Sequence, residues 1–208
     1  MTTMKSNIIT IVINDLTKTY QKNKGIESIT TDFRNGTLNL LVGHNGSGKS
    51  TLIKCIMQVV NYKGKILKKK YRIGYAPENY VMPDFMTVKE FLIAIGRIKD
   101  LYNPYLNLEL DEYLSIFDIK SKLNAPIRSL SNGMKQKVNI TQALLNQPKI
   151  IILDEPLVGL DFNAQKLLIK KIIELSKNYL VIVSTHFPEK FNTSRKRIYK
   201  FNQGKLEC

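Results

Sequence analysis

The sequence has no tryptophan, only two cysteines and no long run of apolar residues. The cysteines, Cys55 and Cys208, lie far apart and match neither a disulfide framework nor a metal-binding spacing. No apolar run approaches the roughly 20 residues that a membrane-spanning helix needs, and the N-terminal residues lack the small-residue cleavage site of a secretory signal. These absences predict a cytosolic protein of a reducing compartment that does not cross a membrane by itself.

Acidic residues are also scarce, since 17 Asp and Glu stand against 32 Lys and Arg, for a net charge of +15 over 208 residues. Such an excess has three explanations: a nucleic-acid partner, an anionic membrane surface, or a lysine-rich surface that is merely solvated. Hydrophobic residues make up 43% of the chain, which is enough to bury a core and argues against intrinsic disorder. The length fits one domain, or one core with a subdomain.

Short apolar runs alternate with helical patterns, an order typical of parallel strands joined by crossover helices. A turn-rich segment, Lys18–Gly25, separates the first two expected strands, and from about Glu78 to Asn124 only helical periodicity is found. The expected strands are Ile8–Ile13, Ser28–Phe33, Leu38–Val42, Lys65–Leu67, Ile73–Ala76, Ile150–Leu153, Leu180–Ser184 and Arg197–Phe201. The expected helices are Ser50–Val59, Thr87–Ile98, Leu108–Phe117, one that begins near Met134 and ends near Pro148, and Asn163–Lys177.

A glycine-rich segment, Gly43–Thr51, fits the pattern G-x-x-x-x-G-K-[ST] between an expected strand and an expected helix. Glycines let the backbone wrap around a phosphate chain, its N–H groups point inward, and the helix N-terminus adds partial positive charge. Lys49 is then expected to reach the β- and γ-phosphates, and the Ser50 hydroxyl to hold Mg²⁺. The predicted nucleotide-binding residues here are Gly43, His44, Asn45, Gly46, Ser47, Gly48, Lys49, Ser50 and Thr51, with no catalytic role for His44.

The expected strand Ile150–Leu153 ends in two carboxylates, Asp154 and Glu155. Ligands of open α/β folds bind at the carboxyl ends of parallel strands, where Asp154 is suited to position Mg²⁺. Glu155 is suited to orient or deprotonate an attacking water. By themselves these residues are as well explained by a solvated strand end. Together with the phosphate loop they predict nucleotide hydrolysis.

The segment Leu130–Lys137 resembles the signature, usually L-S-G-G-Q, of the nucleotide-binding subunits of ATP-binding cassette (ABC) transporters, and the resemblance covers nearly the whole chain. It implies an α/β fold: a P-loop NTPase core with a mainly parallel sheet, an N-terminal antiparallel β subdomain and an α-helical ABC-specific subdomain. It also implies a single ABC ATPase domain over residues 1–208. Residues 1–77 and 149–208 are the expected nucleotide-binding core with the β subdomain, and residues 78–148 the helical subdomain with the signature.

In this family the signature contacts the ATP held by the opposite subunit, and Ser131, Asn132 and Gly133 occupy the corresponding positions. Asn132 and Met134 replace the usual glycine and glutamine. Asparagine accommodates left-handed backbone conformations better than most residues, which would preserve the loop geometry. The structural alternative is a Ser131 N-cap with an Asn-Gly turn before a helix.

Four further positions match family elements. Tyr20 is in the place of the aromatic residue that stacks on adenine, although a lone tyrosine also serves for packing. Glu78 replaces the lid-loop glutamine and keeps an oxygen ligand for Mg²⁺. Asp161 falls in the D-loop at the dimer interface, with a helix N-cap as the alternative, and His186 matches the switch histidine that contacts the γ-phosphate. The expected catalytic residues are Glu155, His186 and Lys49.

The resemblance implies an ATPase with ATP and Mg²⁺ as cofactors, a head-to-tail dimer of ATPase subunits, and a separate integral membrane permease. The location is then cytoplasmic, peripheral on the inner face of the cell membrane. The run Gly133–Lys137 resembles a signature variant that is common among exporters, which favours export of a peptide, antibiotic or similar amphipathic substrate. The basic stretches Lys68–Arg72 and Arg195–Arg197 are expected on a solvated surface, some of it facing anionic lipid.

Two alternatives remain open from the sequence. A soluble ABC-type ATPase acting on ribosomes or nucleic acid would use the +15 charge, but such proteins usually carry two cassettes or a long insertion, and neither is visible, so nucleic acid is not the expected partner. A non-hydrolysing regulatory cassette is the other alternative, because Glu78, Asn132 and Met134 depart from the family pattern.

Overall fold

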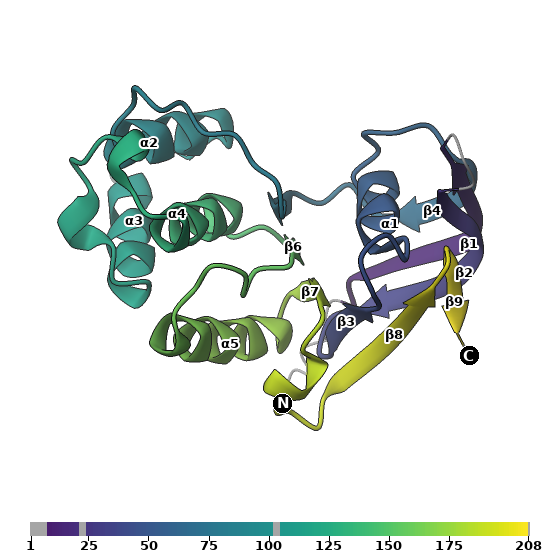
Figure 1. Cartoon of the computed structure of the whole chain (residues 1–208). Coiled ribbons are helices and arrows are strands. Elements are labelled where there is room, and N and C mark those ends of the chain that lie inside the picture. The colour runs from purple at the N-terminus through teal and green to yellow at the C-terminus, as the bar shows by residue number, and fades with distance from the viewer. Residues whose placement is uncertain (1–7, 21–23, 102–104, 208) are drawn as a thin grey trace, which may run out of the picture.

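The computed structural model describes residues 8–20, 24–101 and 105–207, which form two β-sheets with helices packed beside them (Figure 1). The strands are β1 (Thr10–Thr19), β2 (Gly25–Arg34), β3 (Leu38–Val42), β4 (Lys63–Lys68), β5 (Ile73–Ala76), β6 (Ile150–Asp154), β7 (Leu180–Thr185), β8 (Lys196–Asn202) and β9 (Lys205–Glu207). The helices are α1 (Lys49–Ile56), α2 (Val88–Ile98), α3 (Tyr105–Ile116), α4 (Asn132–Leu144) and α5 (Phe162–Ser176), with the 3-10 turns η2 (Lys120–Lys122), η3 (Ile127–Ser129) and η4 (Pro188–Lys190).

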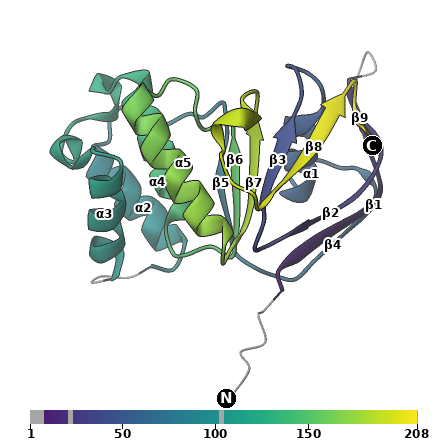
Figure 2. The same cartoon turned by 90° about the horizontal axis from the view of Figure 1, so that it is seen from below.

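The larger sheet has six strands in the order β5-β6-β7-β3-β8-β9, and its neighbouring strands are parallel except for the antiparallel pair β8 and β9. The smaller sheet is antiparallel with the order β2-β1-β4. Helices α2, α3 and α4 gather on the side of the molecule away from the smaller sheet (Figures 1 and 2). This arrangement confirms the predicted α/β class with a mainly parallel sheet, an N-terminal antiparallel sheet and a helical part.

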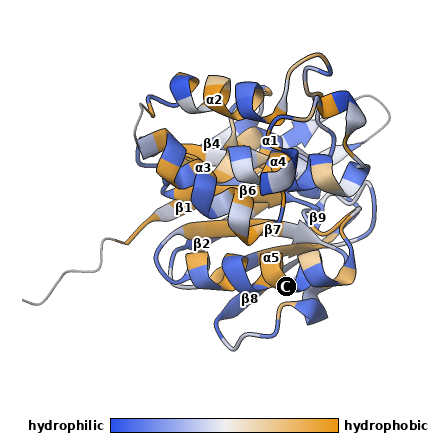
Figure 3. Ribbon diagram, turned by 90° about the vertical axis from the view of Figure 1, so that its left-hand side faces the viewer, coloured by the Kyte–Doolittle hydropathy of each residue, from blue (hydrophilic) through white to orange (hydrophobic). Residues whose placement is uncertain are grey.

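The core lies on both faces of the larger sheet, because β6 and β7 are buried along their whole lengths. Along β6, Ile151 and Leu153 face the helices, whereas Ile150 and Ile152 face the smaller sheet. Strands buried on both faces have continuous apolar sequences, which is why these strands were predictable. Helix α5 alternates hydrophilic and hydrophobic residues (Figure 3) and packs only one face against the sheet. Because both faces of β6 and β7 are packed, the positions of the residues at the ends of these strands are well defined.

The first hairpin is longer than the sequence predicted. Lys18 and Thr19, expected in a turn, belong to β1, and β1 itself begins at Thr10 rather than Ile8. The register of β1 shifts on both sides of Leu16, and Asp15 has φ 48°. Such bulges break the two-residue alternation of apolar side chains. The strand predicted from that alternation therefore ends at Ile13, whereas β1 continues to Thr19.

Other elements differ at their ends. Helix α4 begins at Asn132 rather than near Met134, and β9 was not expected. Cys55 is buried and burial raises the pKa of its thiol to about 11, so the thiol stays protonated. Cys208 and Pro104 lie outside the described residues. Within the described ranges, no helix combines the length and the apolar composition needed to span a membrane.

Lys99, at the end of α2, ties the helices together, because its ammonium donates to the carbonyl oxygen of Gln142 in α4. Burial lowers the pKa of Lys99 to about 8, and the charge of Glu109 on α3 only partly opposes this. Between pH 8 and the ordinary lysine value of 10.5, the unfolded chain therefore binds a proton that the folded chain has released. The free energy of unfolding rises with pH in that window.

We therefore expect Lys99→Met to remove a pH-dependent gain in stability. From pH 7.5 to pH 9.5 the free energy of unfolding of the wild type should rise by about 2 kcal/mol relative to the variant. Urea unfolding of both proteins at the two pH values measures this difference. If the difference in unfolding free energy between the two proteins were the same at both pH values, the lowered pKa of Lys99 would be wrong.

Candidate functional site

The loop between β3 and α1 has the backbone shape that its glycines permit. Gly43, Gly46 and Gly48 have φ values of 158°, 79° and 113°. A Cβ on Gly43 would lie 2.3 Å from the carbonyl oxygen of Phe201, and one on Gly48 would lie 2.7 Å from Cγ2 of Ile26. The glycines at positions 43 and 48 therefore allow the loop to pack closely against neighbouring segments before α1 begins.

A cleft of about 450 Å³ opens beside this loop, within the usual size range of small-molecule sites. It brings together the loop, the start of α1 and three segments that are distant in the sequence. The residues that line it are Tyr20, Lys24, Gly25, Asn45, Gly46, Ser47, Gly48, Lys49, Ser50, Thr51, Glu78 and Glu155. Most of the predicted nucleotide-binding residues thus share one cleft with two of the predicted carboxylates.

Two predicted nucleotide-binding residues do not line this cleft. Gly43 lies at the base of the loop, where its carbonyl oxygen accepts a hydrogen bond from Lys49 at 2.6 Å. His44 is exposed, its Nδ1 lies 2.8 Å from the carbonyl oxygen of Asn45, and its side chain borders a neighbouring hollow of about 640 Å³.

Lys49 is the buried cation of the loop, with only 6% of its surface exposed. Its ammonium donates to the carbonyl oxygens of Gly43 at 2.6 Å and His44 at 3.3 Å. The same ammonium lies 3.7 Å from Oε1 of Glu155. A positive charge fixed by backbone carbonyls at the first residue of α1 adds to the partial charge of that helix end, so the loop favours an anion.

Asp154 and Glu155 follow the last apolar residue of β6, beside the end of β7. Oδ1 of Asp154 accepts a hydrogen bond from the Ser184 hydroxyl at 2.5 Å, and the Ser184 oxygen accepts one from the Glu155 N–H at 2.8 Å. Glu155 has φ 48°, a left-handed conformation that costs roughly 1 kcal/mol or more for a residue with a side chain. Ser184 therefore fixes the carboxylate of Asp154 and the backbone of Glu155 at the strand end, a role that the sequence did not reveal.

The carboxylate of Glu155 lies between His186 and Lys49. Its Oε1 lies 3.0 Å from Nε2 of His186 and 3.7 Å from Nζ of Lys49. Burial raises the pKa of Glu155, His186 (when protonated) and Lys49 oppose this rise, and the charges of Asp154 and Glu78 reinforce it. A carboxylate with a raised pKa is a better proton acceptor than an ordinary one.

His186 bridges Glu155 to the phosphate loop. Its Nε2 lies 2.9 Å from Oδ1 of Asn45 as well as 3.0 Å from Oε1 of Glu155. A neutral imidazole has one N–H, so this nitrogen can donate to either acceptor. The hydrogen bond to Asn45 places the imidazole beside the Glu155 carboxylate, whose buried Oε1 has no hydrogen-bond partner among the described residues.

The residues predicted to bind Mg²⁺ are Ser50, Asp154 and Glu78. Ser50 and Glu78 line the cleft, and Asp154 is buried at the adjoining strand end. Burial raises the pKa of Tyr75 to about 12, and the charges of Asp154 and Glu78 add to this rise. In the part of the chain that the structure describes, no cluster of three or more His, Cys, Asp or Glu side chains could hold a metal alone. The donor set fits a Mg²⁺ ion that is held jointly with phosphate oxygens and water.

Tyr20 lies at the rim of the cleft with 39% of its surface exposed. The ammonium of Lys18 is 4.9 Å from the centre of its ring. The ring is therefore not a core packing residue, and its exposure permits stacking with a flat ligand.

The signature segment does not line the cleft of its own chain. Ser131 caps α4, since its hydroxyl oxygen accepts the N–H of Met134 at 3.2 Å. Asn132 is the first residue of α4 and is not in the left-handed region, so the tolerance of asparagine for that conformation is not used at this position. Asp161 caps α5, with Oδ1 accepting the N–H of Ala164 at 2.9 Å. The capping alternatives proposed for Ser131 and Asp161 are thus present.

Gly133 brings the signature segment against the segment before α5. A Cβ on Gly133 would lie 2.6 Å from the carbonyl oxygen of Gly159, a backbone atom that cannot move aside as a side chain can. We expect Gly133→Ala to displace the start of α4 and to cost about 1 to 3 kcal/mol of unfolding free energy, as other overpacking substitutions do. Urea unfolding measures the cost. Asn132→Ala, at an exposed neighbouring position, is the control, and equal stability of the two variants would contradict the contact.

Comparison with known proteins finds ABC transporter proteins by sequence and by structure. The profile of the family described as "ABC transporter" matches residues 26–158. The mouse ABC-type organic anion transporter ABCA8A is 31% identical over 216 residues, and an ABC transporter ATP-binding protein of Methanocaldococcus jannaschii is 29% identical over 196 residues. These alignments cover 95% and 94% of this chain, 13% of the mouse protein and 75% of the M. jannaschii protein.

A solved structure of the ATP-binding subunit of an ABC transporter superposes on this chain with a TM-score of 0.87 and 27% identity. The superposition covers 95% of this chain and 88% of the other. By contrast, the chain spans 13% or less of the length of the mammalian relatives that it matches.

Proposed function

The chain belongs to the ABC transporter family and carries the ATP-binding domain of that family, and on that premise we propose that it hydrolyses ATP to power transport through a separate membrane-spanning partner. The observation that carries the proposal is the cleft, in which the Lys49 ammonium lies 3.7 Å from the Glu155 carboxylate beside the phosphate loop. A cation for phosphate and a base for water are thus adjacent, as hydrolysis of a phosphate anhydride requires.

In the proposed mechanism the N–H groups of residues 43–51 and the start of α1 bind the phosphate chain. Lys49 stabilises negative charge on the terminal phosphate, and Glu155 accepts the proton of the attacking water. His186 keeps the carboxylate of Glu155 in place. Ser50, Asp154 and Glu78 would hold Mg²⁺, which neutralises phosphate charge when it is bound.

We further propose that two copies join head to tail, so that Ser131, Asn132 and Gly133 of one copy close the cleft of the other. The support is that these residues and Asp161 lie outside the cleft of their own chain. In addition, Val158 and Phe162 beside Asp161, and Phe187 next to His186, expose large apolar side chains. Apolar residues exposed beside functional segments are typical of interaction surfaces.

Sedimentation velocity tests the dimer. With ATP and Mg²⁺, a Glu155→Gln variant that binds but does not hydrolyse ATP should sediment as a dimer, and a Lys49→Ala variant should remain monomeric. A Glu155→Gln protein that binds ATP yet stays monomeric would refute a homodimer and require a different partner ATPase.

For the remaining parts of the chain we propose residues 1–77 and 149–208 as the nucleotide-binding core and residues 78–148 as the part that receives a cytoplasmic helix of the permease. The support is the segment after Glu78, in which Val81 is 99% and Phe85 is 82% exposed. The protein then acts at the cytoplasmic face of the membrane. Export of an amphipathic substrate such as a peptide or antibiotic is the finer proposal, supported by the exporter-like run Gly133–Lys137.

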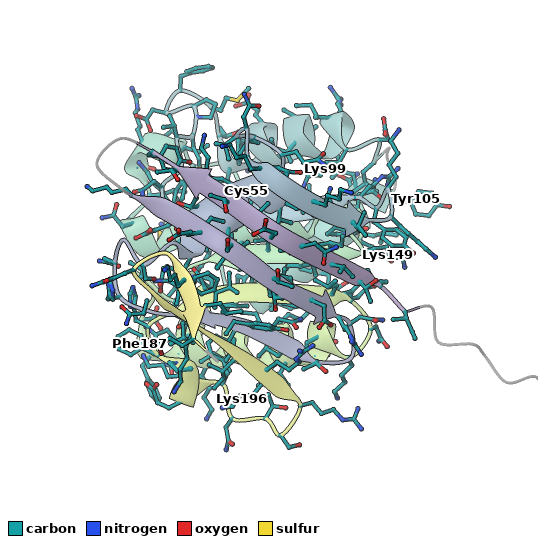
Figure 4. All side chains as sticks on the ribbon, turned by 90° about the vertical axis from the view of Figure 1, so that its right-hand side faces the viewer. Cys55, Lys99, Tyr105, Lys149, Phe187 and Lys196 are labelled. Atoms are coloured by element: carbon teal, nitrogen blue, oxygen red, sulfur yellow. The ribbon has the colours of Figure 1, made fainter. Side chains whose placement is uncertain are left out.

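The basic charge supports contact with anionic lipid beside that partner. Figure 4 views the outer face of the smaller sheet, whose edge strand β4 and following residues expose Lys63, Lys65, Lys69, Lys70 and Arg72. Two of the arginines are partly neutralised, since Arg72 lies 3.9 Å from Asp100 and Arg197 of the second basic stretch is paired with Asp32 at 3.2 Å. The same exposed lysines favour the second candidate function, an ATPase stimulated by ribosomes or nucleic acid.

Phosphate release by the purified chain tests the proposed function. We expect release that requires both ATP and Mg²⁺, and stimulation by co-purified permease in vesicles with anionic lipid. Stimulation by ribosomes or RNA without any membrane association would favour the second candidate. No release under any of these conditions would indicate a regulatory cassette that does not hydrolyse ATP.

A further inference from the structure

One face of α4 carries three amide side chains, Gln136, Asn139 and Gln142, spaced three residues apart. Side chains at this spacing are neighbours on a helix surface. Gln136 and Asn139 are 5% and 2% exposed, and Gln142 is half-buried. Buried amides are unfavourable unless they are hydrogen-bonded, so their partners indicate what this face is for.

Each amide donates from α4 to a backbone carbonyl oxygen of a neighbouring segment of the same chain. Gln136 donates to Pro156 at 3.2 Å, Asn139 to Pro77 at 2.9 Å and Gln142 to Tyr75 at 2.7 Å. The amides also contact one another, at 3.5 Å from Asn139 to Gln136 and 3.4 Å from Gln142 to Asn139. We call Gln136, Asn139 and Gln142 the amide ladder.

The acceptors of the ladder belong to the two segments that carry the cleft carboxylates. Pro156 directly follows Glu155, and Pro77 directly precedes Glu78. Helix α4 also touches β5 closely, because a Cβ on Gly74 would lie 1.9 Å from the carbonyl oxygen of Ala143. The ladder therefore links the helix that begins with the signature segment to both Glu155 and Glu78.

The chemistry of this face differs from ordinary packing. Hydrogen bonds are directional, so they fix the rotation and the sliding of α4 against these two segments in addition to the packing. Thr141 on the same helix shows the contrast. Thr141 is fully buried, but its hydroxyl donates to the carbonyl oxygen of Lys137 within α4 at 2.9 Å. It therefore makes its hydrogen bond inside the helix and not to the segments that carry Glu155 and Glu78.

We propose that the amide ladder is a set of positioning residues that transmits the orientation of α4 to Glu155 and Glu78. A rotation of α4, such as contact of Ser131–Gly133 with a second copy would produce, then moves the carbonyls of Pro156 and Pro77 and with them the two carboxylates. Hydrolysis becomes efficient only when α4 has its correct orientation. This inference rests on the proposed ATP hydrolysis.

The test compares apolar replacements of similar shape with a matched control. Asn139→Leu and Gln136→Met remove donors that bond from α4 to the segments of Pro77 and Pro156. Thr141→Val removes a buried hydroxyl that bonds only within α4. We expect kcat for ATP hydrolysis to fall at least tenfold in the ladder variants, with KM for ATP within threefold of the wild type and with kcat of Thr141→Val nearly unchanged. A kcat that is unchanged in the ladder variants, or that falls equally in Thr141→Val, would overturn the proposal.

Hydrogen exchange provides a readout that needs no hydrolysis. The N–H groups beside the two acceptor prolines should exchange faster in Asn139→Leu than in the wild type, and at the wild-type rate in Thr141→Val. They belong to Tyr75, Ala76, Glu78, Asn79, Tyr80, Glu155, Leu157 and Val158. If the wild type lacks ATPase activity, the proposed function fails and this comparison still decides whether the ladder holds the two segments. Should Asn139→Leu not fold, Gln142→Met at the half-buried end of the ladder gives the same comparison, and unchanged exchange there would count against the ladder.

Discussion

Replacement of Glu155 by glutamine is expected to lower kcat for ATP hydrolysis by at least 100-fold while ATP binding is retained. A positioned general base contributes about 10²- to 10⁴-fold to a rate. Glutamine keeps the shape of the side chain beside Lys49 and His186 but cannot accept the proton of the attacking water. Phosphate release and equilibrium binding of a fluorescent ATP analogue measure the two quantities separately.

The control for this substitution is Glu189→Gln. Glu189 is an exposed glutamate of η4, three residues after His186, and no interaction in the described structure links it to the cleft. Its replacement should leave kcat within twofold of the wild type. If Glu155→Gln also hydrolyses ATP at the wild-type rate, Glu155 is not the base.

The second large effect is expected at Lys49. Lys49→Ala removes a buried ammonium that the loop holds with two carbonyl oxygens, and truncation of one partner in a buried charged interaction costs about 2 to 5 kcal/mol. We therefore expect the affinity for ATP to fall at least 30-fold. The loss of a cation 3.7 Å from Glu155 also removes a charge that lowers the pKa of that carboxyl.

Isothermal titration with ATP and Mg²⁺ measures this effect, with Lys54→Ala as the matched control. Lys54 lies in the same helix, α1, but is exposed and does not line the cleft. Its replacement should change the affinity less than threefold. Equal affinities of the Lys49→Ala variant and the wild type would show that the triphosphate does not bind at this loop.

Much of the site could be predicted because its key residues occur in contiguous motifs at strand ends. Lys49, Glu155 and His186 come from three distant segments, yet each follows a predicted strand of the larger sheet. Parallel strands end at one sheet edge, so motifs placed after them meet there. The register confirms this, since Asp154 is opposite Ser184 and Ser184 is next to Thr185, which pairs with Val42.

Other features could not be predicted because their partners are backbone atoms. Ser184 bonds to the N–H of Glu155, and the amides of Gln136 and Asn139 bond to carbonyl oxygens. A carbonyl exists at every residue, so such contacts leave no pattern in the sequence. The full length of β1 was missed for a different reason, because its bulges beside Leu16 shift the apolar side chains out of alternation.

A crystal structure of the Glu155→Gln variant with ATP and Mg²⁺ is the most direct test of the nucleotide site. The proposed function predicts the triphosphate along residues 43–51, with its terminal phosphate between Lys49 and position 155 and its adenine against Tyr20. A triphosphate bound elsewhere, for example in the neighbouring hollow lined by Thr17, Thr19 and Glu27, would contradict it.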